Sequence, residues 1–466
     1  NNPAYSAMCS SYDYDAPISE PGWTTDKFFL LRDLLKNYLP AGETLPAVPA
    51  ALPVIEIPEF HFHKVAPLFS NLPEAKQTVD IQPMEQFNQG WGTILYRTTL
   101  PETTLAGTTL KITEVHDWAQ IYADGKLLAR LDRRKGEFTT TLPALKKGTQ
   151  LDILVEAMGR VNFDKSIHDR KGITEKVELI SGNQTKELKN WTVYNFPVDY
   201  SFIKDKKYSD TKILPTMPAY YKSTFTLDKV GDTFLDMSTW GKGMVWVNGH
   251  AMGRFWEIGP QQTLFMPGCW LKEGENEILV LDLKGPTRAS IKGLKKPILD
   301  VLREKAPETH RKDGEKLKLT GEKVGHEGAF TPGNGWQEVR FATPVKGRYF
   351  CLEALSPQAN DNIAAIAEFD VLGADGKPVS REHWKIRYAD SEETRSGNRT
   401  ADKIFDLQES TFWMTVDNVP YPHQLVIDLS KVENVTGFRY LPRAEKGYPG
   451  MIKEYRVYVK PADFNY

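Results

Sequence analysis

The sequence predicts a mainly β chain, with several β-sandwich or jelly-roll domains preceded by the last strand–helix step of an incomplete (β/α)8 barrel. Most of the chain consists of short runs of alternating apolar and polar residues, broken by Gly, Asn and Asp turns, with little helical periodicity. The opening differs, because a Tyr- and Asp-rich strand at residues 12–15 precedes one amphipathic helix from Asp26 to Tyr38. A single strand–helix step without partner strands is typical of the end of such a barrel.

Length and composition predict how the chain divides into domains. At about 150 residues per domain, 466 residues correspond to about three domains. Five prolines between Pro40 and Pro58 favour an extended linker. We expect the end of a barrel at 1–40, a Pro-rich linker at 41–83, a first β-sandwich at 84–205, a second at 206–305 and a third at 312–466.

The first two sandwiches share landmarks in the same order. Each has a tyrosine that opens a strand, then a tryptophan, then a two-residue turn. These landmarks are Tyr96, Trp118 and Asp124-Gly125 in the first copy, and Tyr221, Trp240 and Asn248-Gly249 in the second. Asp-Gly and Asn-Gly predict type I′ hairpin turns, in which both central residues have positive φ. The shared order indicates a duplication.

Bulk properties exclude several classes of function. The net charge is −2 with both signs interspersed, so we expect no nucleic-acid partner. No run of 18 apolar residues is present, so we expect no transmembrane span. Cys9, Cys269 and Cys351 lie too far apart to indicate a disulfide framework or a metal site. No sequence motif for a serine hydrolase, a zinc protease or a nucleotide-binding loop is present.

The opening carries the first resemblance to a known family. Tyr12-Asp13-Tyr14-Asp15-Ala16-Pro17, followed by Phe28-Phe29-Leu30-Leu31-Arg32-Asp33, resembles glycoside hydrolase family 35, the β-galactosidases, near the end of their (β/α)8 barrel. The resemblance implies that Tyr12 and Tyr14 line the galactose pocket. The two catalytic glutamates of that family come from earlier barrel strands, and no residue here matches either. We therefore expect no catalytic residue and no metal ligand in this chain.

The resemblance implies the C-terminal part of a retaining exo-β-galactosidase that hydrolyses terminal non-reducing β-D-galactosyl residues. Its partners would be β-galactosides or galactose-containing glycans and the missing N-terminal barrel, and the chain alone would be inactive. We expect an exported bacterial protein (periplasmic, cell-surface or secreted) whose signal peptide is not visible because the N-terminus is missing. The alternative is a non-catalytic, multi-domain carbohydrate-binding or adhesion protein. The strand and helix at the opening favour the enzyme, because a pure binding protein has no reason to carry one barrel step.

The two copied sandwiches resemble the galactose-binding-like domains of the same family, most distinctly at residues 248–256 and 259–271. His250, Arg254 and Trp256 are candidates for a sugar site, but packing is the preferred interpretation because a fold does not confer a binding site. The charged run at 164–171 is interpreted as a solvated hairpin tip.

The end of the chain resembles a discoidin (coagulation-factor type C) domain. The matching runs are residues 384–393, 411–413, 423–429 and 436–443. A run that usually ends this domain, residues 336–369, comes first here. A circular permutation that gives one sandwich explains this order, since the termini of compact domains often lie close together. The rival explanation, two incomplete domains, would leave open sheet edges.

Many discoidin-like modules bind sugar and hold calcium in a Phe-Asp-Gly-Asp loop. Here the loop reads Phe405-Asp406-Leu407-Gln408, so leucine replaces the glycine of the tight turn and glutamine replaces an anionic ligand. Calcium is therefore possible but doubtful, and no other cofactor is expected. The candidates for weak sugar contacts are Tyr421, His423, Arg443 and Tyr448, which lie in or near predicted loops.

Overall fold

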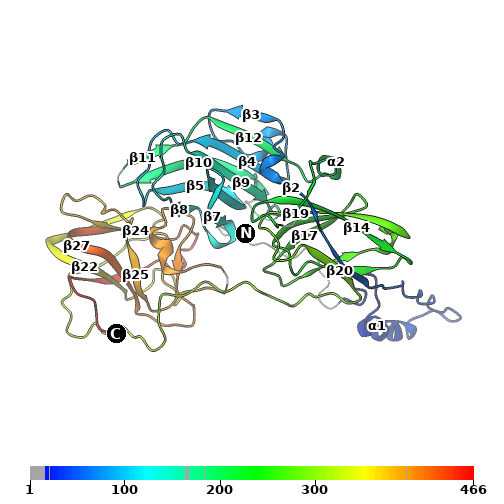
Figure 1. Ribbon diagram of the computed structural model, residues 1–466. Coiled ribbons are helices and arrows are strands. Elements are labelled where there is room, and N and C mark those ends of the chain that lie inside the picture. The colour runs from blue at the N-terminus through cyan, green and yellow to red at the C-terminus, as the bar shows by residue number, and fades with distance from the viewer. Residues whose placement is uncertain (1–15, 20, 163–166, 183, 212, 396) are drawn as a thin grey trace. The chain divides into compact units, whose positions relative to one another are not determined.

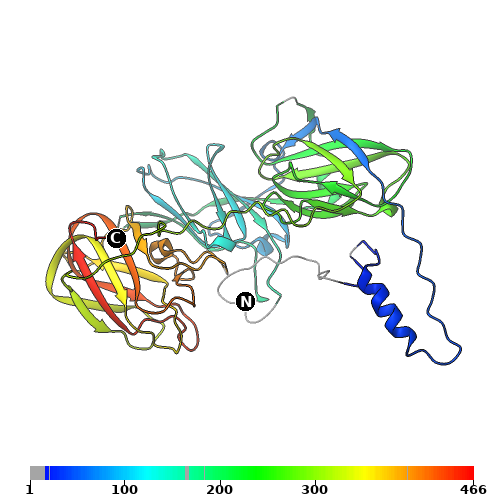
Figure 2. The same ribbon diagram turned by 90° about the horizontal axis from the view of Figure 1, so that it is seen from below.

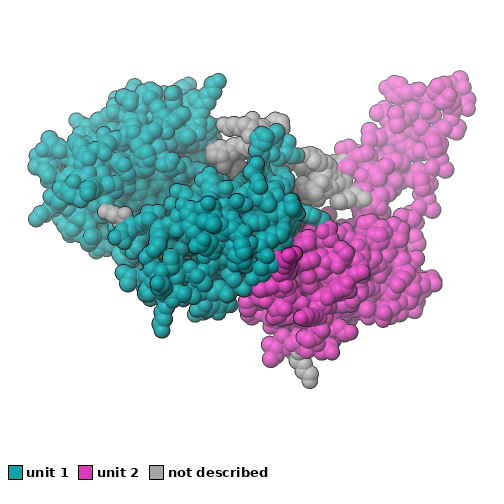
Figure 3. Space-filling view, turned by 90° about the horizontal axis from the view of Figure 1, so that it is seen from above, with its two compact units in different colours: residues 1–7, 75–196, 306–466 teal, residues 8–74, 197–305 magenta. Residues whose placement is uncertain are grey.

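The computed structural model describes residues 16–19, 21–162, 167–182, 184–211, 213–395 and 397–466, and it confirms a mainly β protein (Figure 1). The described residues form two compact units (Figure 3). One unit contains residues 75–196 and 306–466, and the other contains residues up to 74 together with 197–305. No helix in the described part of the chain is long and apolar enough to cross a membrane.

Helix α1 (Asp26–Lys36) lies where the sequence predicts it. Thr25 occupies the N-cap position, but its hydroxyl donates to the carbonyls of Ala16 and Pro17, 3.0 and 3.1 Å away, and does not cap the helix. No residue of α1 is buried, and Leu34 on its apolar stripe is 52% exposed. In Figure 2 the helix stands apart from the strands of its own compact unit, residues up to 74 and 197–305. The helix therefore presents an apolar stripe that the described residues do not cover.

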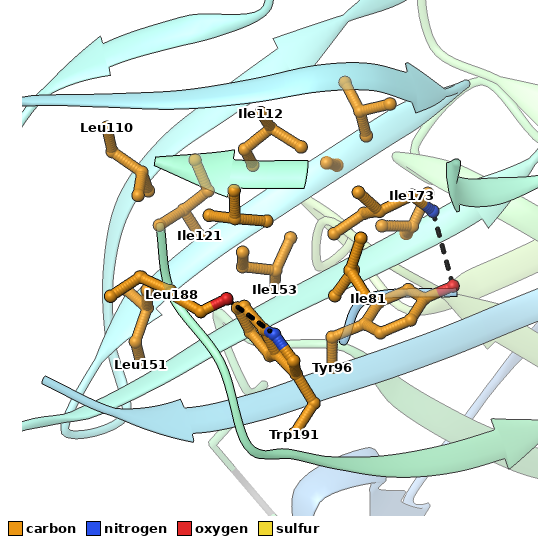
Figure 4. Close-up of a cluster of buried hydrophobic side chains, with 14 of the residues drawn as sticks. Ile81, Tyr96, Leu110, Ile112, Ile121, Leu151, Ile153, Ile173, Leu188 and Trp191 are labelled. Carbon is orange, nitrogen blue, oxygen red and sulfur yellow. Dashed lines mark hydrogen bonds between the residues drawn. The ribbon is translucent and has the colours of Figure 1, made fainter. Parts of the chain in front are cut away.

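The first sandwich consists of two sheets that enclose a continuous core. Its strands are β3 (Ala75–Thr78), β4 (Gly92–Thr99), β5 (Thr109–His116), β6 (Trp118–Ala123), β7 (Lys126–Asp132), β8 (Thr139–Thr141), β9 (Gln150–Ala157), β10 (Gly172–Ser181), β11 (Gln184–Glu187) and β12 (Trp191–Phe196). One sheet has the order β3-β12-β4-β9-β6-β7 and the other β11-β10-β5-β8. Two buried aromatic residues between the sheets are hydrogen-bonded to the backbone (Figure 4). The Tyr96 hydroxyl accepts from the Ile173 N–H, and the Trp191 Nε1–H donates to the carbonyl of Leu188.

The second sandwich repeats this arrangement. Its elements are β1 (Ile57–His61), β2 (Lys64–Pro67), α2 (Tyr200–Ile203), β13 (Ser209–Asp210), β14 (Ala219–Leu227), β15 (Thr233–Asp236), β16 (Lys242–Val247), β17 (His250–Trp256), β18 (Thr263–Met266), β19 (Gly274–Asp282) and β20 (Ser290–Leu294). The sheets have the orders β13-β2-β14-β19-β16-β17 and β1-β20-β15-β18. The structure differs from the sequence-based expectation at residues 57–67. That segment was expected to be linker, but its apolar residues enter this core as β1 and β2.

Matching strand orders and turns support the predicted duplication. The central order β4-β9-β6-β7 in the first sandwich corresponds to β14-β19-β16-β17 in the second. The turns between the last two strands of each series have positive φ at both central residues, 44° and 77° at Asp124-Gly125 and 48° and 86° at Asn248-Gly249. Two-residue turns of this kind match the right-handed twist of paired strands. Tyr96 and Tyr221 are both fully buried in their cores.

The third sandwich is formed from both halves of the segment that begins after residue 311. Its elements are β21 (His326–Ala329), β22 (Gln337–Ala354), β23 (Ala365–Ile366), β24 (Glu368–Leu372), β25 (Lys385–Ala389), β26 (Trp413–Met414), β27 (His423–Leu441) and β28 (Glu454–Lys460). The early strand β22 pairs with the late strands β27 and β28, and one core includes Phe350 and Trp413. A single domain therefore contains the out-of-order runs, as a circular permutation requires.

Candidate functional site

The four weak sugar-contact candidates meet at one end of the third sandwich. Two contacts tie the loops there together: the Tyr421 hydroxyl donates to the carbonyl of Ile363 at 2.6 Å, and the Gly450 N–H donates to Asp361 at 3.0 Å. The loop between β22 and β23, the loop before β27 and the loop before β28 therefore meet at this end of the sandwich. This end, with the four candidates, is named the loop end below.

His423 and Tyr421 hold this end together from the inside. His423 is fully buried, with Nδ1 2.8 Å from Asp390 and Nε2 2.7 Å from the carbonyl oxygen of Asn362. The Tyr421 ring packs edge-on against it at 4.6 Å, and burial raises the pKa of the Tyr421 hydroxyl. The expected sugar contact by His423 is therefore corrected, because both ring nitrogens are engaged and no face of the ring meets solvent.

Arg443 and Tyr448 lie closer to the surface of the loop end. The Arg443 guanidinium stacks over Phe412, 4.6 Å from the ring centre, and pairs with Glu445. Its Nε has no hydrogen-bond partner among the described residues, and burial lowers the pKa of Arg443. Tyr448 has a positive φ of 56° in the turn that its N–H closes onto Glu445, and its half-buried ring lies at the rim. Both side chains are thus partly exposed at the loop end.

Sequence reasoning missed Arg399. Its guanidinium also stacks on Phe412, 4.2 Å from the ring centre, and it forms no ion pair with any residue in the described ranges. Burial, and then the charge of Arg443, lower the pKa of Arg399. No local pattern marks this residue, because Phe412 and Arg443 reach it only through the tertiary fold. Guanidinium N–H groups without a hydrogen-bond partner can donate to sugar hydroxyl groups.

The loop at Asp406 shows how the chain departs from a calcium site. Leu407 has a φ of 64°, the left-handed conformation that glycine adopts without strain. Asp406 accepts from the Thr411 hydroxyl at 2.9 Å, and Lys403 lies 3.9 Å from its carboxylate. Nearby, Arg381 pairs with Glu368.

This set of donors does not fit a calcium ion. Burial raises the pKa of both Glu368 and Asp406, and their proximity raises that of Glu368 further. Lys403 and Arg381 supply positive charge where the cation would lie, and no group of three or more His, Cys, Asp or Glu in the described part of the chain could hold a metal. We therefore assign no chemistry to calcium here.

A buried ionic cluster lies in the first sandwich. The Lys171 ammonium is fully buried, 2.7 Å from Asp117 and 2.8 Å from Asp169. Arg133 bridges the same two carboxylates, at 2.7 Å from each. Burial alone would raise the pKa of Asp169, but hydrogen bonds from His116 and Lys171 and the charge of Arg133 hold it well below its usual range.

This cluster corrects one interpretation made from the sequence. Asp169 and Lys171, expected in a solvated hairpin tip, are 5% and 0% exposed. Isolated buried charges are costly, so they occur where oppositely charged partners surround them. The partners here, Asp117 and Arg133, are distant in sequence, so the local charge pattern could not reveal them.

The other candidate residues are the two tyrosines near the start of the chain and the aromatic residues around β17. Tyr12 and Tyr14 lie outside the described residues. In the second sandwich Phe255 is buried in the core, and the Lys242 ammonium lies 4.2 Å from the ring centre of the half-buried Trp256. His250 stacks on Trp270 at 4.6 Å, so the packing interpretation accounts for these aromatic residues.

Comparison with family models defines the class of protein. Residues 82–197 match the first all-beta domain of β-galactosidase, residues 218–276 match its galactose-binding domain, and residues 388–466 match the F5/8 type C domain. Two of its sandwiches are thus similar to β-galactosidase domains, and its end is similar to an F5/8 type C (discoidin) domain. The resemblances described from the sequence are confirmed.

Comparison with individual proteins leads to the same family. The chain is 35% identical over 269 residues to a β-galactosidase of Xanthomonas manihotis (57% of this chain, 43% of that protein) and 32% identical over 308 residues to β-galactosidase 1 of Dictyostelium discoideum (58% and 44%). It is 33% identical over 356 residues to a β-galactosidase of Bos taurus (66% and 51%). The chain spans about half the length of these relatives. It is related to the C-terminal part of β-galactosidases.

Proposed function

We propose that this chain is the C-terminal part of a retaining exo-β-galactosidase that hydrolyses terminal non-reducing β-D-galactosyl residues. The observation that carries the proposal is the occurrence of two β-galactosidase sandwich domains in one chain, in the region most similar to proteins named β-galactosidase. The substrates would be β-galactosides or galactose-containing glycans.

A retaining mechanism requires two carboxyl groups about 5–5.5 Å apart, one as nucleophile and one as acid/base. We place both in a barrel outside this chain, since no residue of its sequence matches the family's catalytic glutamates. Tyr12 and Tyr14 would complete the galactose pocket through their hydroxyl groups and rings. The chain alone would then not hydrolyse a β-galactoside.

The apolar stripe of α1 supports a covering domain. Leu31, Leu34 and Leu35 are 42%, 52% and 54% exposed. Fully burying a leucine side chain contributes about 1.5–3 kcal/mol, so these three residues would stabilise a docked barrel substantially. The sandwiches would buttress that barrel, and Arg399, Arg443 and Tyr448 would contact glycan at the loop end. We propose an exported location on the family resemblance alone.

Hydrolysis of a chromogenic β-galactoside tests the proposal. We expect no activity from the chain alone and activity when it is mixed with the separately expressed barrel of its parent protein. Leu31→Glu with Leu34→Glu should abolish this complementation, whereas Lys27→Glu on the same helix should leave it largely intact. Hydrolysis by the chain alone would contradict the placement of the catalytic glutamates elsewhere. Sugar binding without complementation would favour the carbohydrate-binding protein.

A further inference from the structure

A polar pocket of about 570 Å3 lies within the compact unit formed by residues 75–196 and 306–466. One wall is strand β8 of the first sandwich, and the other is the outer face of the third sandwich around β24. Two hydrogen bonds join the walls: the Lys111 ammonium donates to the carbonyl of Leu407, and the Asn398 amide donates to the carbonyl of Lys135 at 3.3 Å. The volume lies within the range of small-molecule sites, about 300–1,000 Å3.

The first wall presents unused hydrogen-bonding groups. Strand β8 is the edge of its sheet, paired on one side with β5 through Leu110 and Thr140. Because antiparallel pairing uses the backbone of alternate residues, Thr139 and Thr141 direct their N–H and C=O groups away from β5. The hydroxyls of Thr109, Thr139, Thr140 and Thr141 form no hydrogen bond with any described residue. Each hydroxyl can both donate and accept.

The second wall is a rigid charged floor beside one unpaired carboxylate. Asp370 accepts from Arg381 Nε at 2.9 Å through one oxygen and from Arg439 Nε at 2.9 Å through the other. These three side chains are therefore held in place before any ligand arrives. Glu382 differs, since its carboxylate makes no ion pair with a described residue and occupies the space that a Cβ on Gly107 would take.

Charge and lining together define the chemistry of an occupant. Arg381 and Arg439 balance Asp370 and Glu382, and the Lys403 ammonium lies 3.9 Å from the remaining carboxylate, Asp406. A balanced pocket favours an uncharged ligand over an ion. Dense hydroxyl, backbone and carboxylate groups suit a ligand rich in hydroxyl groups, while Phe405 offers an apolar surface for its C–H groups.

We propose that this pocket is a second carbohydrate site, separate from the loop end, which takes a neutral mono- or disaccharide. The edge of β8 and Glu382 bind the sugar hydroxyls, and the Asp370–Arg381–Arg439 network holds the opposite wall. The site is independent of the catalytic proposal, because it uses only residues of this chain and would function in an adhesion protein as well as in an enzyme.

Calorimetric titration of the full chain with lactose tests the site, with galactose, glucose and maltose as further neutral probes. We expect saturable binding of at least one of these sugars. Thr139→Val with Thr141→Val, which removes two hydroxyls at nearly constant shape, should weaken that binding roughly tenfold. Glu382→Gln should weaken it as well. The control is Thr226→Val at an exposed position of β14 in the second sandwich, which does not line the pocket and should bind as the native chain does.

Any of four outcomes would overturn the proposal. The first is the absence of saturable binding by all four sugars. The second is binding that the threonine and Glu382 substitutions leave unchanged. If Tyr448→Ala alone abolishes it, the sugar binds at the loop end and the pocket is not a site. Galacturonate serves as the charged probe, and tighter binding of galacturonate than of galactose through these same residues would contradict the selection of a neutral ligand. Thermal unfolding of each variant verifies that it is folded.

Discussion

Replacing Lys171 with methionine should strongly destabilise the first sandwich. The lysine ammonium is 0% exposed and donates to Asp117 at 2.7 Å, to Asp169 at 2.8 Å and to the carbonyl of Gly159 at 3.0 Å. Methionine keeps most of the side-chain shape but removes the charge and all three hydrogen bonds. Two buried carboxylates would then face each other with Arg133 as their main shared cation.

The size of this effect follows from the burial of the pair. Removing one partner of a buried ion pair costs about 3–5 kcal/mol, because an uncompensated charge stays in the interior. In a domain of intermediate length, a loss of 1 kcal/mol lowers the unfolding temperature by about 4 °C. The loss of the Lys171 charge therefore corresponds to a decrease of roughly 10–20 °C. An exposed pair is worth only about 0–1 kcal/mol. Lys176→Met, which removes a 45% exposed lysine paired with Glu178 at 2.9 Å, is the matched control.

Differential scanning calorimetry of the full chain measures both variants, since the sandwiches need not unfold together. We expect Lys171→Met to move one transition down by the amount above and Lys176→Met to move it by only a few degrees at most. Equal, small shifts for the two variants would refute the assignment of the Lys171 cluster as a buried, fully paired network.

Three further predictions concern pH, backbone strain and calcium. Burial lowers the pKa of His116, but its hydrogen bonds to Asp169 and Glu114 outweigh burial and raise that pKa above the usual value. The stability contributed by protonated His116 is therefore present below about pH 6.5 and is lost as pH rises through the folded pKa. The destabilisation by His116→Gln, measured by thermal unfolding, should therefore shrink from pH 5 to pH 9, whereas a constant difference would contradict this origin. Leu407→Gly should raise stability by about 1 kcal/mol, because it relieves the left-handed conformation at φ 64°, and a lower unfolding temperature would show that leucine packing dominates. Calcium in place of chelator should leave the unfolding temperature unchanged, since Lys403 and Arg381 already neutralise the carboxylates, and a clear increase would reveal a bound ion.

The sequence predicted the features that depend on neighbouring residues. The apolar stripe after Thr25 predicted α1, and the turns at Asp124-Gly125 and Asn248-Gly249 adopt the positive φ angles expected of them. The sequence also showed leucine in the place of a glycine at residue 407, but only the structure gave its left-handed φ of 64°. These are local effects of side-chain periodicity and backbone sterics, and both are properties of a few consecutive residues.

The candidate site was predicted less completely, because burial and pairing depend on distant residues. Tyr421, His423, Arg443 and Tyr448 do gather at the loop end, but His423 is buried there by Asp390 and Asn362. Polar residues in predicted loops are expected to be accessible, but tertiary hydrogen bonds remove His423 from solvent. The same limitation hid Arg399 and the pocket beside β8.

The sequence by itself thus determined the β-rich class, the repeated hairpins and the relationship to β-galactosidases. Only the tertiary structure decided that residues 57–67 complete the second core, that one sheet unites β22 with β27 and β28, and that Lys171 lies among carboxylates. The physical reason is the same in each case. Apolar area and charge are stabilised by whichever surfaces surround them, and those surfaces come from segments far apart in the chain.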